Sequence, residues 1–331
     1  MYLKDSLEGI NKIIAFAEER GKVLEDLIAR KDELRAKIDN FSTIRKIKEG
    51  KYISIGAVDS SFGEVFGDDW GRRLYAVCVS GMGFIPNGFI QKDPEVLTEE
   101  SILEYEEDDE YKRILRGLAI AEEIHSAKEW FSDMDLVLID GSAKSSIIAI
   151  NQSITSKNLE KSESGRRLKA IYKETLNAFY DMLHMGMLVF IPKRSGEVLI
   201  ANKVNSPINN DYALLETVLD EGEYIIIDAE TISEAQPWVY TLPKIDGVSE
   251  EFLSKLFNLL KDLKIIYFKT LAGRIVKLET HLPLSVNTLW DCFILEGENI
   301  LAYYTDRNAK KHLEMLINFA YKINPWNYRI Y

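Results

Sequence analysis

Cysteines and long hydrophobic runs are scarce in this chain. Two of its 331 residues are cysteines, Cys78 and Cys292, and they lie far apart in the sequence. Their spacing excludes a CxxC metal knuckle and a disulfide framework, and it fits a reducing cytoplasm. No apolar run approaches the roughly 18 residues that span a membrane, so we expect a cytoplasmic protein without a membrane partner. Lys4, Asp5 and Glu8 place charges where a signal-peptide core tolerates none.

Positive charge is also in short supply. The chain has 41 lysines and arginines against 53 aspartates and glutamates, which gives a net charge of -12. Taken alone, this balance argues against non-specific binding to nucleic acid, because that affinity comes largely from neutralised phosphates. Eight of the acids fall in residues 99–110, which we interpret as a solvated helix entrance. A nucleic-acid partner would therefore need a local positive strip.

Residues 1–48 predict an N-terminal helical arm. Its apolar side chains recur at alternating steps of four and three residues, with Gly21 at one position of the seam. The seam consists of Leu3, Leu7, Ile10, Ile14, Ala17, Leu24 and Ile28. Gly21 is expected to break or bend the helix, because glycine costs about 1 kcal/mol in a helix interior. Two interpretations stay open, namely a dimer or partner contact and an amphipathic helix packed on its own domain.

Residues 49–331 predict one compact α/β domain, because no linker or internal repeat interrupts them. The core is an antiparallel meander with a turn at Gly81 and Gly83, followed by two helix–strand units. The expected strands are 52–59, 73–79, 84–90, 136–140 and 188–191, with helices at 111–131 and 166–185. This order is that of an RNase H-like mixed five-stranded sheet with helices on both faces. Further elements are expected at 224–228, 250–263, 265–268, 275–278 and 308–321. An ATP-using fold shares the order, but the chain has no GxxxxGK[ST] loop.

Two aspartates end apolar strands of this core. Asp59 closes the first strand and Asp140 the fourth, and each is followed by small polar residues. Because the two strands are neighbours in the predicted fold, the carboxylates would lie close together. Like charges at that distance are costly unless a cation joins them, and Mg²⁺ or Mn²⁺ prefers such oxygen ligands. Two such ions would serve phosphodiester hydrolysis. The alternative is that each aspartate only forms a turn.

A third carboxylate is expected from the helix at 111–131. Glu123 is the first candidate and Glu122 the second, since both lie in an apolar stretch where an acid is costly unless paired or metal-bound. Arg116 lies two turns before Glu123 on the same helix face. A plain ion pair within the helix is therefore the alternative explanation.

Three stretches together resemble the NurA family, the archaeal and bacterial nucleases that work with the HerA helicase. They are residues 57–61 (AVDSS), 139–142 (IDGS) and 300–312 (ILAYYTDRNAKKH). The resemblance in order extends from about residue 50 to 320. It implies a Mn²⁺-dependent deoxyribonuclease, with Mg²⁺ as a substitute and two ions in the site. It also implies a homodimer that acts as a 5′–3′ exonuclease and single-strand endonuclease. Its role would be DNA end resection for recombinational repair, with a hexameric HerA-type helicase.

The resemblance assigns site residues by position. The metal aspartates correspond to Asp59 and Asp140, and the helix glutamate to Glu123. A tyrosine eight positions before a histidine, near the end of the family's chain, corresponds to Tyr304 and His312, with His312 as a further metal ligand. Ser60 stands where the family usually has glycine, and the prolines between that tyrosine and histidine are absent.

Several alternatives concern histidines and cations. His281 is the rival of His312 as the functional histidine, and a surface position beside two lysines is the alternative for His312. Lys193 and Arg194, just past the fifth strand, and Lys310 and Lys311 are candidate DNA contacts. The competing function is a non-catalytic nucleic-acid-binding or assembly subunit. Loss of Asp59 or Asp140 would mark such a subunit, and both are present.

Overall fold

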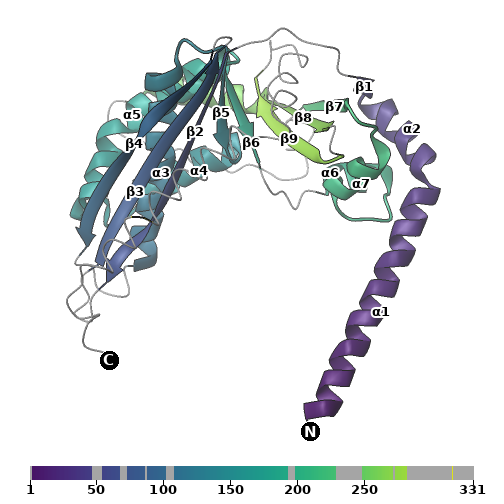
Figure 1. Ribbon diagram of the computed structural model, residues 1–331. Helices are drawn as coiled ribbons and strands as arrows, with labels where there is room; N and C mark the ends of the chain where they lie inside the picture. Colours follow the sequence, from purple (N-terminus) through teal and green to yellow (C-terminus); the bar gives the residue numbers. More distant parts are fainter. Residues whose placement is uncertain are drawn as a thin grey trace. The chain divides into compact units, whose positions relative to one another are not determined.

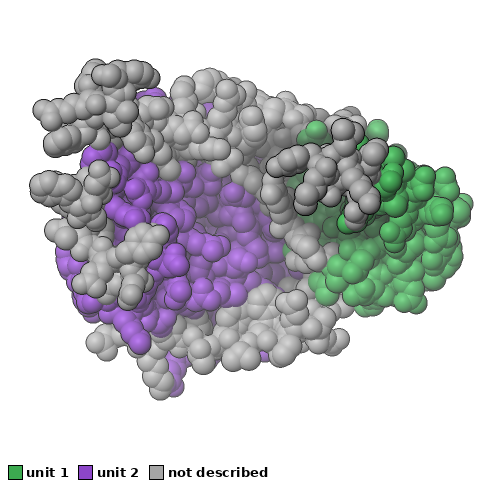
Figure 2. Space-filling view, turned by 90° about the horizontal axis from the view of Figure 1, so that it is seen from below, with its two compact units in different colours: residues 1–47, 194–227, 266–277 green, residues 48–193, 228–265, 278–331 purple. Residues whose placement is uncertain are grey.

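The computed structural model divides into two compact units (Figure 2). Unit 1 comprises residues 1–47, 194–227 and 266–277, and unit 2 comprises residues 48–193, 228–265 and 278–331. The structure describes residues 2–46, 54–67, 73–85, 88–101, 108–192, 198–228, 248–270, 273–281 and 315. The expected boundary between an arm and a nuclease domain at residue 48 stays a prediction. The helix expected at 308–321 lies outside the described residues except for Met315, which is helical.

Unit 2 contains the five-stranded core, with the strand order β6-β5-β2-β3-β4 (Figure 1). β2 pairs antiparallel with β3, and β3 with β4, whereas β5 runs parallel to both β2 and β6. The strands are β2 (Ile55–Gly67), β3 (Arg73–Ile85), β4 (Gly88–Ser101), β5 (Leu136–Asp140) and β6 (Leu188–Ile191). The RNase H-like fold class that the sequence predicts is confirmed.

Four described helices belong to this unit, of which two pack against the sheet through their apolar side chains and two pack against other helices. They are α3 (Asp108–Phe131), α4 (Ala143–Ile154), α5 (Glu163–His184) and α9 (Glu250–Lys261), with a 3₁₀ turn at Leu159–Lys161. α3 lies against β2, α4 and α5. Its residues Leu115, Leu118 and Ile124, which recur at helical spacing, are buried. Helix α4 is not predicted from the sequence, because its apolar residues show no clear helical spacing.

The turn expected at Gly81 and Gly83 is wrong, and so is the strand expected at 84–90. β3 runs through both glycines to Ile85, and β4 begins at Gly88. A Cβ at Gly81 would lie 2.7 Å from Cε3 of Trp130, and one at Gly83 would lie 3.0 Å from Cε of Met134. These glycines therefore mark the close approach of residues at and after the end of α3 to the strand.

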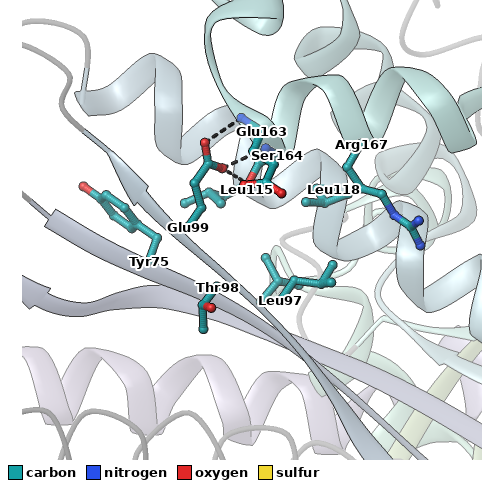
Figure 3. A pocket seen from close by; sticks show the side chains of 10 residues that line it. Tyr75, Leu97, Thr98, Glu99, Leu115, Leu118, Glu163, Ser164 and Arg167 are labelled. Atoms are coloured by element: carbon teal, nitrogen blue, oxygen red, sulfur yellow. Dashed lines mark hydrogen bonds between the residues drawn. The ribbon is translucent and has the colours of Figure 1, made fainter.

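The acidic run at 99–110 serves as more than a solvated helix entrance. Asp108 does begin α3, but Glu99 belongs to β4 and its side chain caps α5 (Figure 3). The Glu99 carboxylate accepts hydrogen bonds from the backbone N of Glu163 at 2.6 Å and of Ser164 at 2.7 Å. A carboxylate at this place complements the positive end of the helix dipole. Part of the acidic excess is therefore structural.

Unit 1 combines the N-terminal helices with a small sheet. β1 (Arg45–Lys46) pairs antiparallel with β7 (Glu223–Asp228), and β8 (Lys264–Lys269) and β9 (Ile275–Thr280) follow in the order β7-β8-β9. The ends of three of these strands belong to unit 2, namely Asp228 of β7, Lys264 and Ile265 of β8, and residues 278–280 of β9. α2 (Lys31–Phe41) packs on α6 (Leu199–Val204) and α7 (Asp211–Val218).

The first helix, α1 (Tyr2–Ala29), runs without interruption through Gly21 (Figure 1). The prediction that Gly21 breaks the helix is therefore wrong. The two N-terminal helices separate at Arg30 instead. Seam residues in the described part of α1 are exposed, with 51% of Ile10, 50% of Ile14 and 58% of Ile28 accessible. These side chains therefore remain about half accessible beside the described residues of their own chain. Among the described helices, none has the length and hydrophobicity to cross a membrane.

Candidate active site

Asp59 and Asp140 follow directly on a paired position of two neighbouring strands. Val58 of β2 lies opposite Ile139 of β5 in the parallel ladder. Neighbouring strands are about 4.8 Å apart, so the two aspartates emerge side by side at the end of that ladder. Asp59 is 5% exposed, and Asp140 is half-buried. The structure thus brings together the two acids that the sequence singles out. The prediction that Asp59 closes its strand is wrong, because β2 continues to Gly67 and only its pairing with β5 ends at Val58, whereas β5 does end at Asp140.

The segment after Asp140 explains why this acid is held in place. Residues 136–139 are buried, so β5 runs through the core and reaches its edge at Asp140. Gly141 adopts a φ of 92°, in the left-handed region that favours glycine, and its N–H donates to the carbonyl of Ile191 at 3.1 Å. The chain then enters α4 at Ala143. A sharp turn and a helix start therefore fix the strand end.

The two candidate glutamates of α3 face different neighbours. Oε2 of Glu123 accepts a hydrogen bond from Oγ of Ser60 at 3.0 Å, next to Asp59 on β2. Glu122 instead forms an ion pair with Arg167 of α5, with Oε1 2.7 Å from Nε. Both side chains are buried. Glu123 is therefore the one that lies beside the end of the β2–β5 ladder.

Glu279 of β9 is a buried acid that the sequence-based reasoning missed. Its Oε2 accepts hydrogen bonds from Oγ of Ser142 at 2.8 Å and from the backbone N of Ala143 at 2.9 Å. It lies opposite Phe190 of β6 in the sheet and is 5% exposed. The expected strand ended at Leu278, whereas β9 extends to Thr280. The sequence signal that could have identified Glu279 was an acid at the end of an apolar strand, the signal that identified Asp140.

Neither a histidine nor a cysteine nucleophile stands out among the described residues. The His281 ring lies 5.8 Å from the ring of His184, and burial, followed by that neighbour, lowers the pKa of His281. His281 is therefore neutral over a wider pH range than a free histidine. Burial raises the pKa of the Cys78 thiol to about 11, which leaves it unreactive.

The remaining candidates lie outside the described residues. They are Lys193, Arg194, Tyr304, Lys310, Lys311 and His312. Their roles stay predictions.

The described residues hold no cluster of three or more His, Cys, Asp or Glu side chains arranged to bind a metal ion. The pair formed by Asp59 and Asp140 nevertheless fits a hard divalent cation in its donor chemistry. Mg²⁺ is commonly bound by one or two carboxylates, with waters and substrate phosphates completing the shell. Two aspartates side by side therefore suit an ion that is shared with a phosphate-bearing substrate.

Solved NurA structures have the same fold as this chain. The NurA nuclease from Sulfolobus solfataricus matches with a TM-score of 0.62 at 12% sequence identity, over 96% of this chain and 98% of that one. A structure of NurA bound to dAMP and manganese matches with a TM-score of 0.52 at 14% identity, over 91% and 92% of the two chains. A structure of NurA with manganese matches with a TM-score of 0.50 at 14% sequence identity, over 91% of this chain and 97% of that one.

These matches confirm the resemblance to NurA at the level of the fold, and the chain has a nuclease fold. No family model and no curated protein sequence matches the chain.

Proposed function

We propose that this protein is a metal-dependent DNA nuclease that hydrolyses phosphodiester bonds. The observation that carries the proposal is the placement of Asp59 and Asp140 directly after the Val58–Ile139 pair. The RNase H-like strand order is what makes these two positions neighbours. The NurA structures with manganese, one of them with dAMP, support a divalent ion and a nucleotide substrate for a chain of this fold.

Asp59 and Asp140 would hold the divalent ion, and Glu123 would complete the acidic group. When bound, Mn²⁺ or Mg²⁺, as one ion or two, would supply a nucleophilic water and neutralise charge on the phosphate. The protein's own contribution is orientation. The hydroxyl of Ser60 holds the Glu123 carboxylate. The ordered turn at Gly141 fixes the backbone of Asp140, so that no reorganisation is needed when substrate binds.

Finer features of the proposal come from the resemblance to NurA. They are 5′–3′ exonuclease and single-strand endonuclease activity, DNA end resection for recombinational repair, and work with a HerA-type helicase. Tyr304 and His312 would join the site, with His312 as a metal ligand, and Lys193, Arg194, Lys310 and Lys311 would contact DNA. The exposed seam of α1 supports a homodimer or partner contact through this helix, because exposed apolar side chains at regular spacing are a common basis of association.

The test is cleavage of end-labelled single- and double-stranded DNA with and without Mn²⁺. Asp59→Asn and Asp140→Asn should each lower the cleavage rate at least a hundredfold, because each removes a charged metal ligand while keeping the side-chain shape. Glu251→Gln, an exposed acid on α9, is the matched control and should cleave like the parent.

Thermal unfolding of each variant checks that the fold is retained. Rates within a few-fold of the parent for either aspartate variant would contradict the metal assignment. A parent protein that binds DNA but cleaves neither substrate with Mn²⁺ or Mg²⁺ would favour the non-catalytic subunit instead.

A further inference from the structure

A basic cleft lies in unit 2 between α3, α4 and β2. It encloses about 380 Å³. Its lining residues are Phe62, Asp109, Lys112, Arg113, Arg116, Ala149, Gln152 and Ser153. Lys112, Arg113 and Arg116 carry positive charge, against the single acid Asp109. This local excess of positive charge is opposite in sign to the net charge of the chain, which is -12.

The two arginines of the cleft are available to a ligand. Lys112, Arg113 and Arg116 are all exposed, and helical spacing places Arg116 one turn from each of the other two. Within the described part of the chain, neither the Arg113 nor the Arg116 guanidinium forms an ion pair. The intrahelical pair between Arg116 and Glu123, one alternative left open by the sequence, is therefore absent. Arginine presents several donors that match phosphate geometry.

Close packing of α3 on α4 makes the floor of the cleft rigid. A Cβ at Gly117 would lie 2.3 Å from Cβ of Ser153, so only glycine permits this approach of the helices. Oγ of Ser153 donates a hydrogen bond to the Arg113 carbonyl at 2.6 Å. The backbone that carries the arginines is thereby fixed to α4.

Helix α3 and strand β2 both run from the cleft to the proposed active site, and each covers about the same distance. Arg116 precedes Glu123 by seven helical residues, or about 10 Å. Phe62 follows Asp59 by three strand residues, also about 10 Å. The Ser60–Glu123 hydrogen bond joins these elements at the acidic end. The cleft therefore lies about three base-pair steps of a duplex from the carboxylates, at about 3.4 Å per step along the duplex axis.

We propose that this cleft binds phosphates of the DNA strand whose bond is cut. Arg113 and Arg116 would each contact a phosphate, Lys112 would add a third positive charge, and half-buried Phe62 would offer a ring to a base. The inference rests on the proposed nuclease function and adds the track along which the strand approaches Asp59 and Asp140. It also supplies the local positive strip that the acidic composition requires.

The test measures DNA binding in the Asp59→Asn background, which keeps the strand intact. The double variant Arg113→Ala/Arg116→Ala should raise the Kd for a labelled single-stranded oligonucleotide at least tenfold in fluorescence anisotropy. The slope of log Kd against log salt should fall by about 1.4, because each lost phosphate contact on a single strand accounts for about 0.7. Arg113→Lys/Arg116→Lys should restore most of the affinity, since the charges return.

The matched control is Lys255→Ala/Lys261→Ala, which removes two exposed cations from α9. It should leave the Kd and the salt slope close to those of the background protein. An alanine variant of the arginines that binds DNA like this control would overturn the cleft assignment, even if the parent cleaves DNA. A parent that neither binds nor cleaves DNA would instead overturn the proposed function, and the cleft assignment with it.

Discussion

At the scale of single residues, the partner of each buried carboxylate decides which role it can take. Glu122 and Glu123 are adjacent and equally buried, yet one pairs with Arg167 and the other accepts a bond from Ser60. Glu279 lies far from Asp140 in the sequence but binds the two residues that begin α4. We therefore regard Glu279 as a positioning residue for the Asp140 turn.

This role predicts the behaviour of Glu279→Ala. The Ser142 hydroxyl and the Ala143 N–H lose their acceptor, so the turn after Asp140 should loosen. We expect the Mn²⁺ concentration for half-maximal cleavage to rise several-fold and the free energy of unfolding to fall by about 1–3 kcal/mol. Glu279→Gln keeps an acceptor oxygen. Its half-maximal Mn²⁺ concentration and its free energy of unfolding should lie between those of Glu279→Ala and the parent. An unchanged Mn²⁺ dependence in Glu279→Ala would remove the positioning role.

At the scale of secondary-structure elements, close contacts rather than propensities decide where elements run. Gly81 and Gly83 read as a turn from sequence, but they let β3 pass beneath Trp130 and Met134. Gly21 reads as a break, yet α1 continues because one glycine costs only about 1 kcal/mol in a long helix. α2 is attached to β7 by Arg35, whose guanidinium contacts Glu223 through two hydrogen bonds of 2.6 and 2.7 Å.

The Arg35–Glu223 pair predicts a pH-dependent contribution to stability. Burial raises the pKa of Glu223, but its bonds with Arg35 and the Asp220 N–H outweigh burial and lower it overall. A carboxyl whose pKa is lowered on folding stabilises the protein above its unfolded-state pKa, and this stabilisation is lost as the pH falls through the folded-state pKa. Arg35→Ala should therefore cost about 1–2 kcal/mol at pH 7. The difference from the parent should shrink below about pH 4.5. A difference that is constant from pH 7 to pH 3 in urea unfolding would refute this account.

At the scale of the whole molecule, the exposed seam of α1 has no partner among the described residues of its own chain. Deleting residues 1–22 removes most of the seam and leaves the buried Leu27, Leu34 and Ile38 in place. If the seam mediates self-association, the deletion should lower the sedimentation mass from that of a dimer to that of a monomer. Cleavage of a short oligonucleotide should decline much less. A dimer that persists in the truncated protein would locate the contact elsewhere.

The sequence by itself determined the order of the core strands along the chain, the end of β5 at Asp140, and the choice of Asp59 and Asp140 as the paired acids, although β2 continues past Asp59 to Gly67. The strands and the end of β5 follow from local periodicity, because a strand buried on both faces must be apolar and the acid at Asp140 marks its edge. The choice of the two aspartates as a pair rests on the RNase H-like arrangement that this order of elements predicts. Only the tertiary structure decided that Glu123 rather than Glu122 lies beside Ser60, that Glu279 holds the turn after Asp140, and that three cations of α3 line a cleft. Such contacts join residues that are far apart in sequence, and no periodic pattern within one segment records which segment packs against it.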